Sequence, residues 1–220
     1  MANNIIAYIG CDSFYIILYL SRILHKLNHR VLLIDYSKEK ALSYCFPKME
    51  GLDLISGTIS YRGVDFTTGF LEEELKNEYD DILINCGMNS PNLNPSFLSK
   101  LIVTTDLLPS NITNIANLSF LKEYQGDVAL LMKDAVESKI TSQYIITTLN
   151  KDISENSISI LYQDEKDNER SILCQVNQIF NFYHISVYLK NYLLKETQLL
   201  SPQTTRRQLR KAYLCARKGE

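Results

Sequence analysis

Short apolar runs alternate along this chain with stretches in which apolar residues recur at helical spacing. Short apolar runs that end at glycine or at polar residues are typical of strands buried on both faces. They are predicted at residues 5–9, 31–34, 81–85, 101–105, 128–132 and 157–162. Helices are predicted at residues 13–28, 70–76, 110–123 and 177–195, and weaker β character at 55–66. The alternation predicts an α/β fold, a three-layer sandwich in which a mostly parallel twisted sheet carries helices on both faces.

Length and composition agree with one domain that has its own hydrophobic core. The chain has 220 residues, of which 45% are hydrophobic and 22% are charged, an ordinary globular balance. We expect this domain to cover residues 1–200. Residues 201–220 are predicted as a basic C-terminal tail whose apolar spacing is compatible with a helix.

Charge and cysteine usage narrow the classes of function. The net charge of −2 gives the chain as a whole no general attraction for nucleic acid. No run of about 18 apolar residues predicts a membrane span, and the N-terminus lacks the basic region of a signal peptide. The five cysteines are widely spaced and form no C-x-x-C motif, so no metal site is predicted. We expect a cytoplasmic protein with reduced thiols.

The first strand, the loop after it and the next helix are arranged as in a nucleotide-binding site. A working phosphate loop ends Gly-Lys-Ser/Thr, so that the lysine reaches the phosphates and the hydroxyl reaches Mg²⁺. At those places this chain has Asp12, Ser13 and Phe14. The scaffold of a phosphate site is therefore predicted without its phosphate-binding side chains.

The order of these segments resembles the MinD/ParA family of deviant Walker ATPases, including its TadZ/CpaE-like branch, which is tied to pilus assembly. The family's loop, Lys-Gly-Gly-x-Gly-Lys-Thr-Thr, covers Tyr8 to Tyr15 without gaps, and only Gly10 is retained. The family's signature lysine falls on Tyr8, its loop lysine on Ser13 and its Mg²⁺ threonine on Phe14. The resemblance covers about residues 4–195 and implies an ATPase-like fold without the ATPase side chains.

Two further strands carry the resemblance. The second strand ends in Asp35, as in the family, whereas the strand that resembles Walker B ends in Asn85 in place of aspartate. A neutral amide is a poorer partner for Mg²⁺-bound water. Residues 158–174 resemble the strand and acidic turn near the family's base pocket. The candidate degenerate nucleotide site is therefore Gly10, Cys11, Asp12, Ser13, Phe14, Asp35 and Asn85.

Asp12 is expected at the start of the first helix, where unpaired N–H groups attract anions. Its carboxylate can accept the hydrogen bonds that a phosphate would accept, and it would repel a triphosphate. The alternative is an ordinary helix cap on a Rossmann-like fold. Cys11 and Ser13 could be nucleophiles on a strand-to-helix turn, but no basic partner for either is identifiable.

The C-terminal tail combines positive charge with a small apolar helical face formed by Leu209, Ala212, Tyr213 and Ala216. Its basic residues are Arg206, Arg207, Arg210, Lys211, Arg217 and Lys218. Such a helix can dock on an anionic membrane, on nucleic acid or on a partner protein, and the alternative is a solvated terminal helix. The resemblance to MinD favours peripheral contact with the inner membrane face.

The resemblance and the missing side chains together predict a non-catalytic scaffold or localisation protein, in a bacterial pilus, secretion or conjugation machine. Neither ATP, ADP nor Mg²⁺ is expected as a cofactor. One alternative is a residual nucleotide binder or slow ATPase, and another is a partition-like protein that binds DNA through its tail. A homodimer is expected, with Tyr8, Tyr15 and Tyr19 as candidate interface residues.

Overall fold

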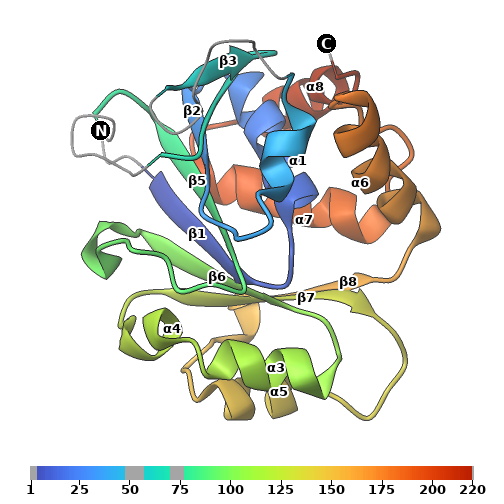
Figure 1. Ribbon diagram of the computed structural model, residues 1–220. Coiled ribbons are helices and arrows are strands. Elements are labelled where there is room, and N and C mark those ends of the chain that lie inside the picture. The colour runs from blue at the N-terminus through green and yellow to red at the C-terminus, as the bar shows by residue number, and fades with distance from the viewer. Residues whose placement is uncertain (1–3, 48–56, 70–76, 220) are drawn as a thin grey trace.

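A twisted, eight-stranded sheet forms the centre of the protein (Figure 1). The computed structural model describes residues 4–47, 57–69 and 77–219. The sheet order is β3-β4-β2-β5-β1-β6-β7-β8, and every pair is parallel except the β3–β4 hairpin. The strands are β1 (Asn4–Gly10), β2 (Val31–Asp35), β3 (Ile59–Tyr61), β4 (Val64–Thr67), β5 (Asp81–Gly87), β6 (Lys100–Thr105), β7 (Val128–Ala135) and β8 (Ile158–Tyr162).

Helices cover both faces of the sheet, as the alternating pattern predicts. On one face lie α1 (Phe14–His25), α6 (Glu165–Asn177), α7 (Val187–Leu200) and α8 (Arg206–Ala216). On the other face lie α3 (Pro109–Ala116), α4 (Ser119–Glu123) and α5 (Ser142–Leu149). Short 3-10 turns occur at Ala41–Cys45, Pro95–Phe97 and Glu155–Ser157. The predicted three-layer α/β fold is therefore confirmed.

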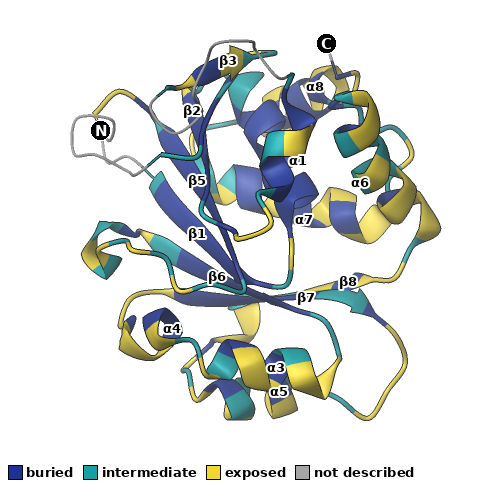
Figure 2. Cartoon of the chain, viewed as in Figure 1, coloured by how far each residue is buried: buried dark blue, intermediate teal, exposed yellow. Residues whose placement is uncertain are grey.

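The central strands are buried on both faces, which explains their apolar runs. Along β1, Ile6 and Tyr8 face the layer that contains α1, whereas Ile5, Ala7 and Ile9 face the layer that contains α3. Figure 2 shows these strands as buried and the outer sides of α3, α5 and α6 as largely exposed. A parallel sheet that is covered on both sides needs apolar residues at every position, not at alternate ones.

Helix α1 is buried around its whole circumference, and this contradicts the tyrosine interface expected from the sequence. Every residue from Phe14 to Leu24 is buried, and both α7 and α8 pack against this helix. The Tyr19 ring stacks on Phe182 with centroids 4.6 Å apart. Tyr8, Tyr15 and Tyr19 therefore belong to the protein's own core and cannot form a surface for a second copy.

Two helix predictions need correction. The helix predicted at 177–195 is two helices, because the chain leaves α6 at Gln178, which has a left-handed φ of 53°, and starts α7 only after Ser186. Between them Phe180 and Phe182 both point into the core, a spacing of two that belongs to extended chain. The acidic turn expected near residue 165 is instead the start of α6, which Asp164 caps.

The helix predicted at 110–123 is likewise divided. It forms α3 and α4, with a break at Asn117 and Leu118. The helix predicted at 70–76 lies outside the described residues. The first helix ends at His25, three residues before Asn28, which has a left-handed φ of 68°.

The basic C-terminal segment is helical and packs on the domain. Thr205 and Gln208 form a capping box at the start of α8. The apolar face of α8 (Leu209, Ala212, Tyr213 and Ala216) is buried in the same core as α1. This apolar face is therefore not available for insertion into a membrane. Among the described helices, none has the length and apolar character needed to cross a bilayer.

Candidate functional site

The sheet's carboxyl edge holds a pocket of about 320 Å³. Five parallel strands contribute to it, because their C-terminal ends meet at this edge. Ligands of open α/β sheets bind at the same place. The lining residues are Gly10, Cys11, Asp12, Ser37, Glu39, Gly87, Met88, Asp106, Asn111, Lys133 and Asp134.

Gly10 closes the first strand in a conformation that only glycine adopts easily. Its φ is 116°, and a Cβ atom there would collide with the carbonyl oxygen of Thr104 on β6. The next N–H, that of Cys11, donates to this same oxygen at 2.8 Å. The loop is thereby held close to β6, and Gly10 is retained for a reason of backbone geometry.

Asp12 occupies the start of the first helix. Its Oδ1 accepts a hydrogen bond of 3.2 Å from the N–H of Phe14, the first residue of α1. Ser13 is the formal N-cap residue, but its side chain makes no capping bond. Asp12 is exposed on its pocket side. Partial burial of its carboxyl group raises the pKa of Asp12, whereas the hydrogen bond from the Phe14 N–H and the charge of Lys133 lower it. Asp12 thus satisfies one of the free N–H groups at the start of α1, from the position before the N-cap.

The two residues at the positions of the loop lysine and the Mg²⁺ threonine are turned into the protein. Ser13 is 1% exposed and Phe14 is 8% exposed. The Phe14 ring packs edge-on to Tyr15 with centroids 5.7 Å apart, inside the core under α1. Neither residue lines the pocket, so the side chains at these two loop positions pack inside the protein and do not face a ligand.

Asp35 is buried at the end of β2 and is engaged through both carboxylate oxygens. Oδ1 accepts from the Ser37 N–H at 3.0 Å, the Ser37 hydroxyl at 2.6 Å and the Asn85 amide at 3.2 Å. Oδ2 accepts from the Leu42 N–H at 2.9 Å. Burial raises the pKa of Asp35, and these hydrogen bonds oppose the rise. The structure brings Asp35 and Asn85 together beneath the pocket, where they hold the segment from Ser37 to Leu42.

Lys133, at the end of β7, is one of the residues of this site that sequence reasoning missed, together with Glu39 and Asp134. Its Nζ donates to the Asp12 carbonyl oxygen at 2.9 Å and lies 3.3 Å from an Asp134 carboxylate oxygen. It also stands 5.6 Å from the centre of the Tyr15 ring. A lysine at the C-terminal end of a predicted parallel strand was the available signal, since such ends converge on the pocket.

The pocket is acidic on balance. Among the described residues that line it, Lys133 is the one cation, whereas Asp12, Glu39, Asp106 and Asp134 supply four carboxylates. Asp106 is itself used structurally, since it accepts from the Leu108 N–H at 3.0 Å and from the Asn111 amide at 2.7 Å. Among the described residues, no three His, Cys, Asp or Glu side chains converge as metal ligands.

Cys11 has no feature of an activated nucleophile. Partial burial raises the pKa of its thiol above the ordinary value, so the reactive thiolate is disfavoured at neutral pH. None of the hydrogen bonds found in the described part of the chain joins Cys11 or Ser13 to a histidine or lysine side chain. The site therefore offers no nucleophile and base pair.

Comparison with solved structures identifies the fold. One similar structure is MinD of Pyrococcus horikoshii with Mg-ADP (14% identity, TM-score 0.63, covering 92% of this chain and 99% of that one). Another is MinD of Aquifex aeolicus in complex with MinC (12% identity, TM-score 0.63, covering 92% of this chain and 97% of that one). A third is a plasmid partition protein of Borrelia burgdorferi (12% identity, TM-score 0.56, covering 93% of this chain and 100% of that one). No protein-family model and no curated protein matches the sequence. The chain has the fold of the MinD/ParA ATPases.

Proposed function

We propose that this protein is a non-catalytic, MinD/ParA-like scaffold or localisation protein whose nucleotide site no longer accepts ATP. The observation that carries the proposal is the charge of the pocket at the carboxyl edge. Four carboxylates face one ammonium group there, and Lys133 already contacts Asp12 and Asp134. A triphosphate brought into this pocket would meet repulsion where phosphate-binding loops provide attraction.

The residues present also fit Mg²⁺–ATP poorly. Phosphoryl transfer depends on a lysine and a metal ion that offset the charge developing on the transferred phosphoryl group. Ser13 and Phe14 provide neither a lysine nor a metal-binding hydroxyl in the pocket. A metal ion at Asp35 would have to displace the hydrogen bonds from Ser37 and Leu42. Each of these features disfavours ATP hydrolysis at this site.

The proposed role is to hold or position other proteins in a bacterial pilus, secretion or conjugation machine. It rests on the resemblance to the TadZ/CpaE-like branch, and on the complex of a similar protein with MinC. We place the protein in the cytoplasm at the inner membrane face, where α8 would act through its charges, since its apolar face is buried. We also propose a homodimer, formed through a surface other than Tyr15 and Tyr19.

Two other functions have specific support. A residual nucleotide binder or slow ATPase is favoured by the cavity itself, which persists at the family position and contains Lys133. A DNA-binding, partition-like protein is favoured by the exposed cations of α8 and by the similarity to a plasmid partition protein. The first predicts saturable nucleotide binding, and the second predicts DNA binding that weakens steeply with salt.

Calorimetric titration of ATP and ADP with Mg²⁺ into the full chain tests the proposal. We expect no saturable binding up to about 1 mM nucleotide. The double variant Asp12→Asn/Asp134→Asn removes two pocket carboxylates, while Asn can still cap α1 and can adopt the left-handed φ of 51° at position 134. We expect this variant to gain weak ATP binding, and the exposed control Asp152→Asn to gain none.

Binding of ATP by the wild-type protein would contradict the closed site. If that binding came with Mg²⁺-dependent turnover that Asp35→Ala abolishes, the slow ATPase would replace the scaffold as the best-supported function. If the double variant failed to bind ATP, the charge argument would be wrong, and the shape left by Phe14 and Ser13 would have to explain the exclusion.

A further inference from the structure

A groove with basic sides and an apolar floor lies between α7 and α8. Its volume is about 450 Å³. Four cations line it: Lys190 of α7, then Arg206, Arg210 and Arg217 on or directly after α8. Its apolar surface comes from Leu194, Leu209, Tyr213 and Leu214, of which Leu214 is the most exposed at 39%. None of the described residues that line it is acidic.

Helical spacing places the groove arginines in one row. With 3.6 residues per turn, Arg206, Arg210 and Arg217 lie within about 40° of one another around the helix axis. The row runs for about 16 Å along α8, at about 1.5 Å per residue. Arg207 and Lys211 carry the same charge on the same helix but do not line the groove. The groove therefore presents an ordered subset of the tail's cations.

None of these cations has an ion-pair partner in the described part of the chain, although Arg217 stands 5.3 Å from the centre of the Tyr183 ring. In the part of the chain that the structure describes, no carboxylate lies within 4.0 Å of Lys190, Arg206, Arg210 or Arg217, while ion pairs do form elsewhere. Lys190 instead stands 5.6 Å from the centre of the Tyr213 ring, at the wall of the groove. Because the whole chain has a net charge of −2, this positive row is a local feature.

We propose that this groove binds a short acidic segment of a partner protein, one that carries carboxylates for the arginine row and apolar side chains for the floor. Arginine matches a carboxylate with two parallel hydrogen bonds, and aromatic and leucine side chains offer apolar contact at the centre. The inference rests on the proposed scaffold role only in assigning a protein as the occupant. It adds to the scaffold role a binding surface and the chemical character of the partner segment that the surface would bind.

The observations favour a peptide over a membrane or DNA. Membrane insertion needs an apolar helix face directed outward, whereas Leu209 and Tyr213 are 8% and 5% exposed and form the floor of a concave surface. Phosphate contacts to DNA need cations but make no use of an apolar floor. An acidic segment with apolar side chains uses both parts of the groove.

Fluorescence anisotropy with a synthetic probe tests the proposal on the full chain without nucleotide. The probe is a labelled helical peptide of glutamates and leucines, with glutamates spaced like the arginine row. We expect saturable, salt-sensitive binding in the micromolar range, weakened at least about tenfold by Arg206→Glu/Arg210→Glu. The matched control Arg207→Glu/Lys211→Glu changes the charge equally on the same helix and should weaken binding less than about twofold.

A second peptide, with serine in place of leucine, keeps the carboxylates and tests the floor. We expect it to bind at least about tenfold more weakly than the leucine probe. Absence of saturable probe binding, equal losses in the two double variants, or equal affinity of the two peptides would overturn the proposal.

Parallel titrations use phosphatidylserine vesicles and a duplex DNA of mixed sequence. Tighter binding of either one, lost in the groove variant and kept in the control, would reassign the groove to a membrane or to DNA. Thermal unfolding checks that both double variants, each with two charge reversals, keep the fold intact. Glutamate at the start of α8 is favoured by the helix dipole. Because the peptide assay contains no nucleotide, its failure and failure of the ATP titration are separate results.

Discussion

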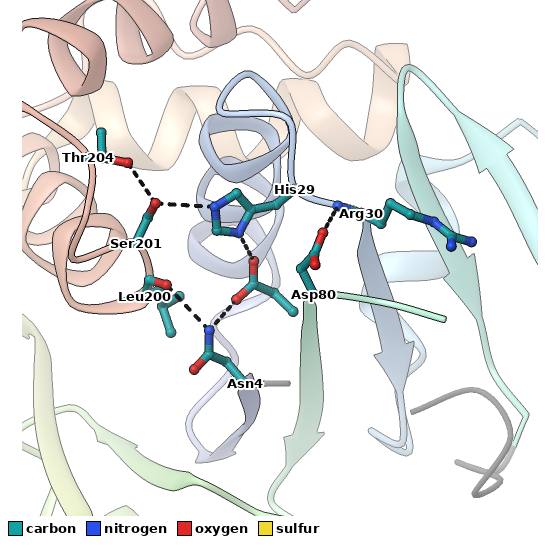
Figure 3. Close-up of polar contacts among 8 residues, drawn as sticks. Asn4, His29, Arg30, Asp80, Leu200, Ser201 and Thr204 are labelled. Atoms are coloured by element: carbon teal, nitrogen blue, oxygen red, sulfur yellow. Dashed lines mark hydrogen bonds and ion pairs between the residues drawn. The ribbon is translucent and has the colours of Figure 1, made fainter. Parts of the chain in front are cut away.

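His29 and Asp81 form a hydrogen-bonded pair, with Nδ1 and Oδ2 2.5 Å apart, at the edge of the sheet opposite the pocket. The Asp81 side chain is fully buried and the His29 side chain is 20% exposed. On its other side, His29 Nε2 lies 3.2 Å from the hydroxyl of Ser201, which contacts Thr204 (Figure 3). The pair thus connects the α1–β2 turn and the start of β5 to the α7–α8 connection.

Replacing His29 should make stability depend less on pH. The hydrogen bond that the Nδ1–H of His29 donates to the Asp81 carboxylate raises the pKa of His29, so folding favours the protonated ring. This contribution is complete below the ordinary pKa of about 6.5 and is lost as pH rises through the raised pKa. We expect His29→Gln to cost about 1–3 kcal/mol at pH 5.5 and less at pH 8.5 by urea unfolding. The control His25→Gln, whose histidine pKa is lowered by burial, should not show this trend.

Removing the Asp12 side chain should weaken the start of α1. Asp12→Ala leaves the Phe14 N–H without its side-chain acceptor, and loss of a cap of this kind costs about 0.5–2 kcal/mol. Chemical denaturation measures the change. Asp152→Ala, which removes an exposed carboxylate from a loop, should stay within about 0.5 kcal/mol of wild type, and equal effects of the two substitutions would argue against the cap.

We expect the Asp35 carboxylate to stabilise the fold and to have no catalytic role. Asp35→Ala removes the acceptor for the N–H groups of Ser37 and Leu42 and for the Asn85 amide, all of which are buried or nearly so. We expect a loss of about 3 kcal/mol, measured by thermal unfolding, because several buried donors lose their partner together. A variant of wild-type stability would show that the segment from Ser37 to Leu42 is held by other contacts.

Tyr19 should behave as a core residue and not as a contact between subunits. Tyr19→Ala removes a ring that stacks on Phe182 and a hydroxyl 3.3 Å from the Cys174 sulfur, so we expect a cost of about 3–5 kcal/mol. Tyr144→Ala, at a tyrosine that is 48% exposed, should cost less than about 1 kcal/mol. Light scattering on both variants reports the oligomeric state, and dissociation of a stable dimer by Tyr19→Ala alone would restore the tyrosine interface.

The sequence by itself determined the order of strands and helices, the family resemblance and the replacement of the loop lysine. These are local properties: apolar runs mark buried strands, Gly10 ends the first strand, and the residue at each loop position can be read directly. The break at Gln178 was missed because a left-handed φ at glutamine leaves no periodic signal, although the spacing of Phe180 and Phe182 hinted at extended chain.

Only the tertiary structure decided what surrounds each side chain. Lys133 reaches the loop at Asp12 across 121 residues of sequence, because β7 lies two strands from β1 and ends at the same edge. Tyr19 is buried because Cys174 of α6 and Phe182, both from the far end of the chain, pack against its side chain. The periodicity of one helix gives the direction of its side chains, but whether a given direction meets solvent depends on segments that pack there from elsewhere in the chain.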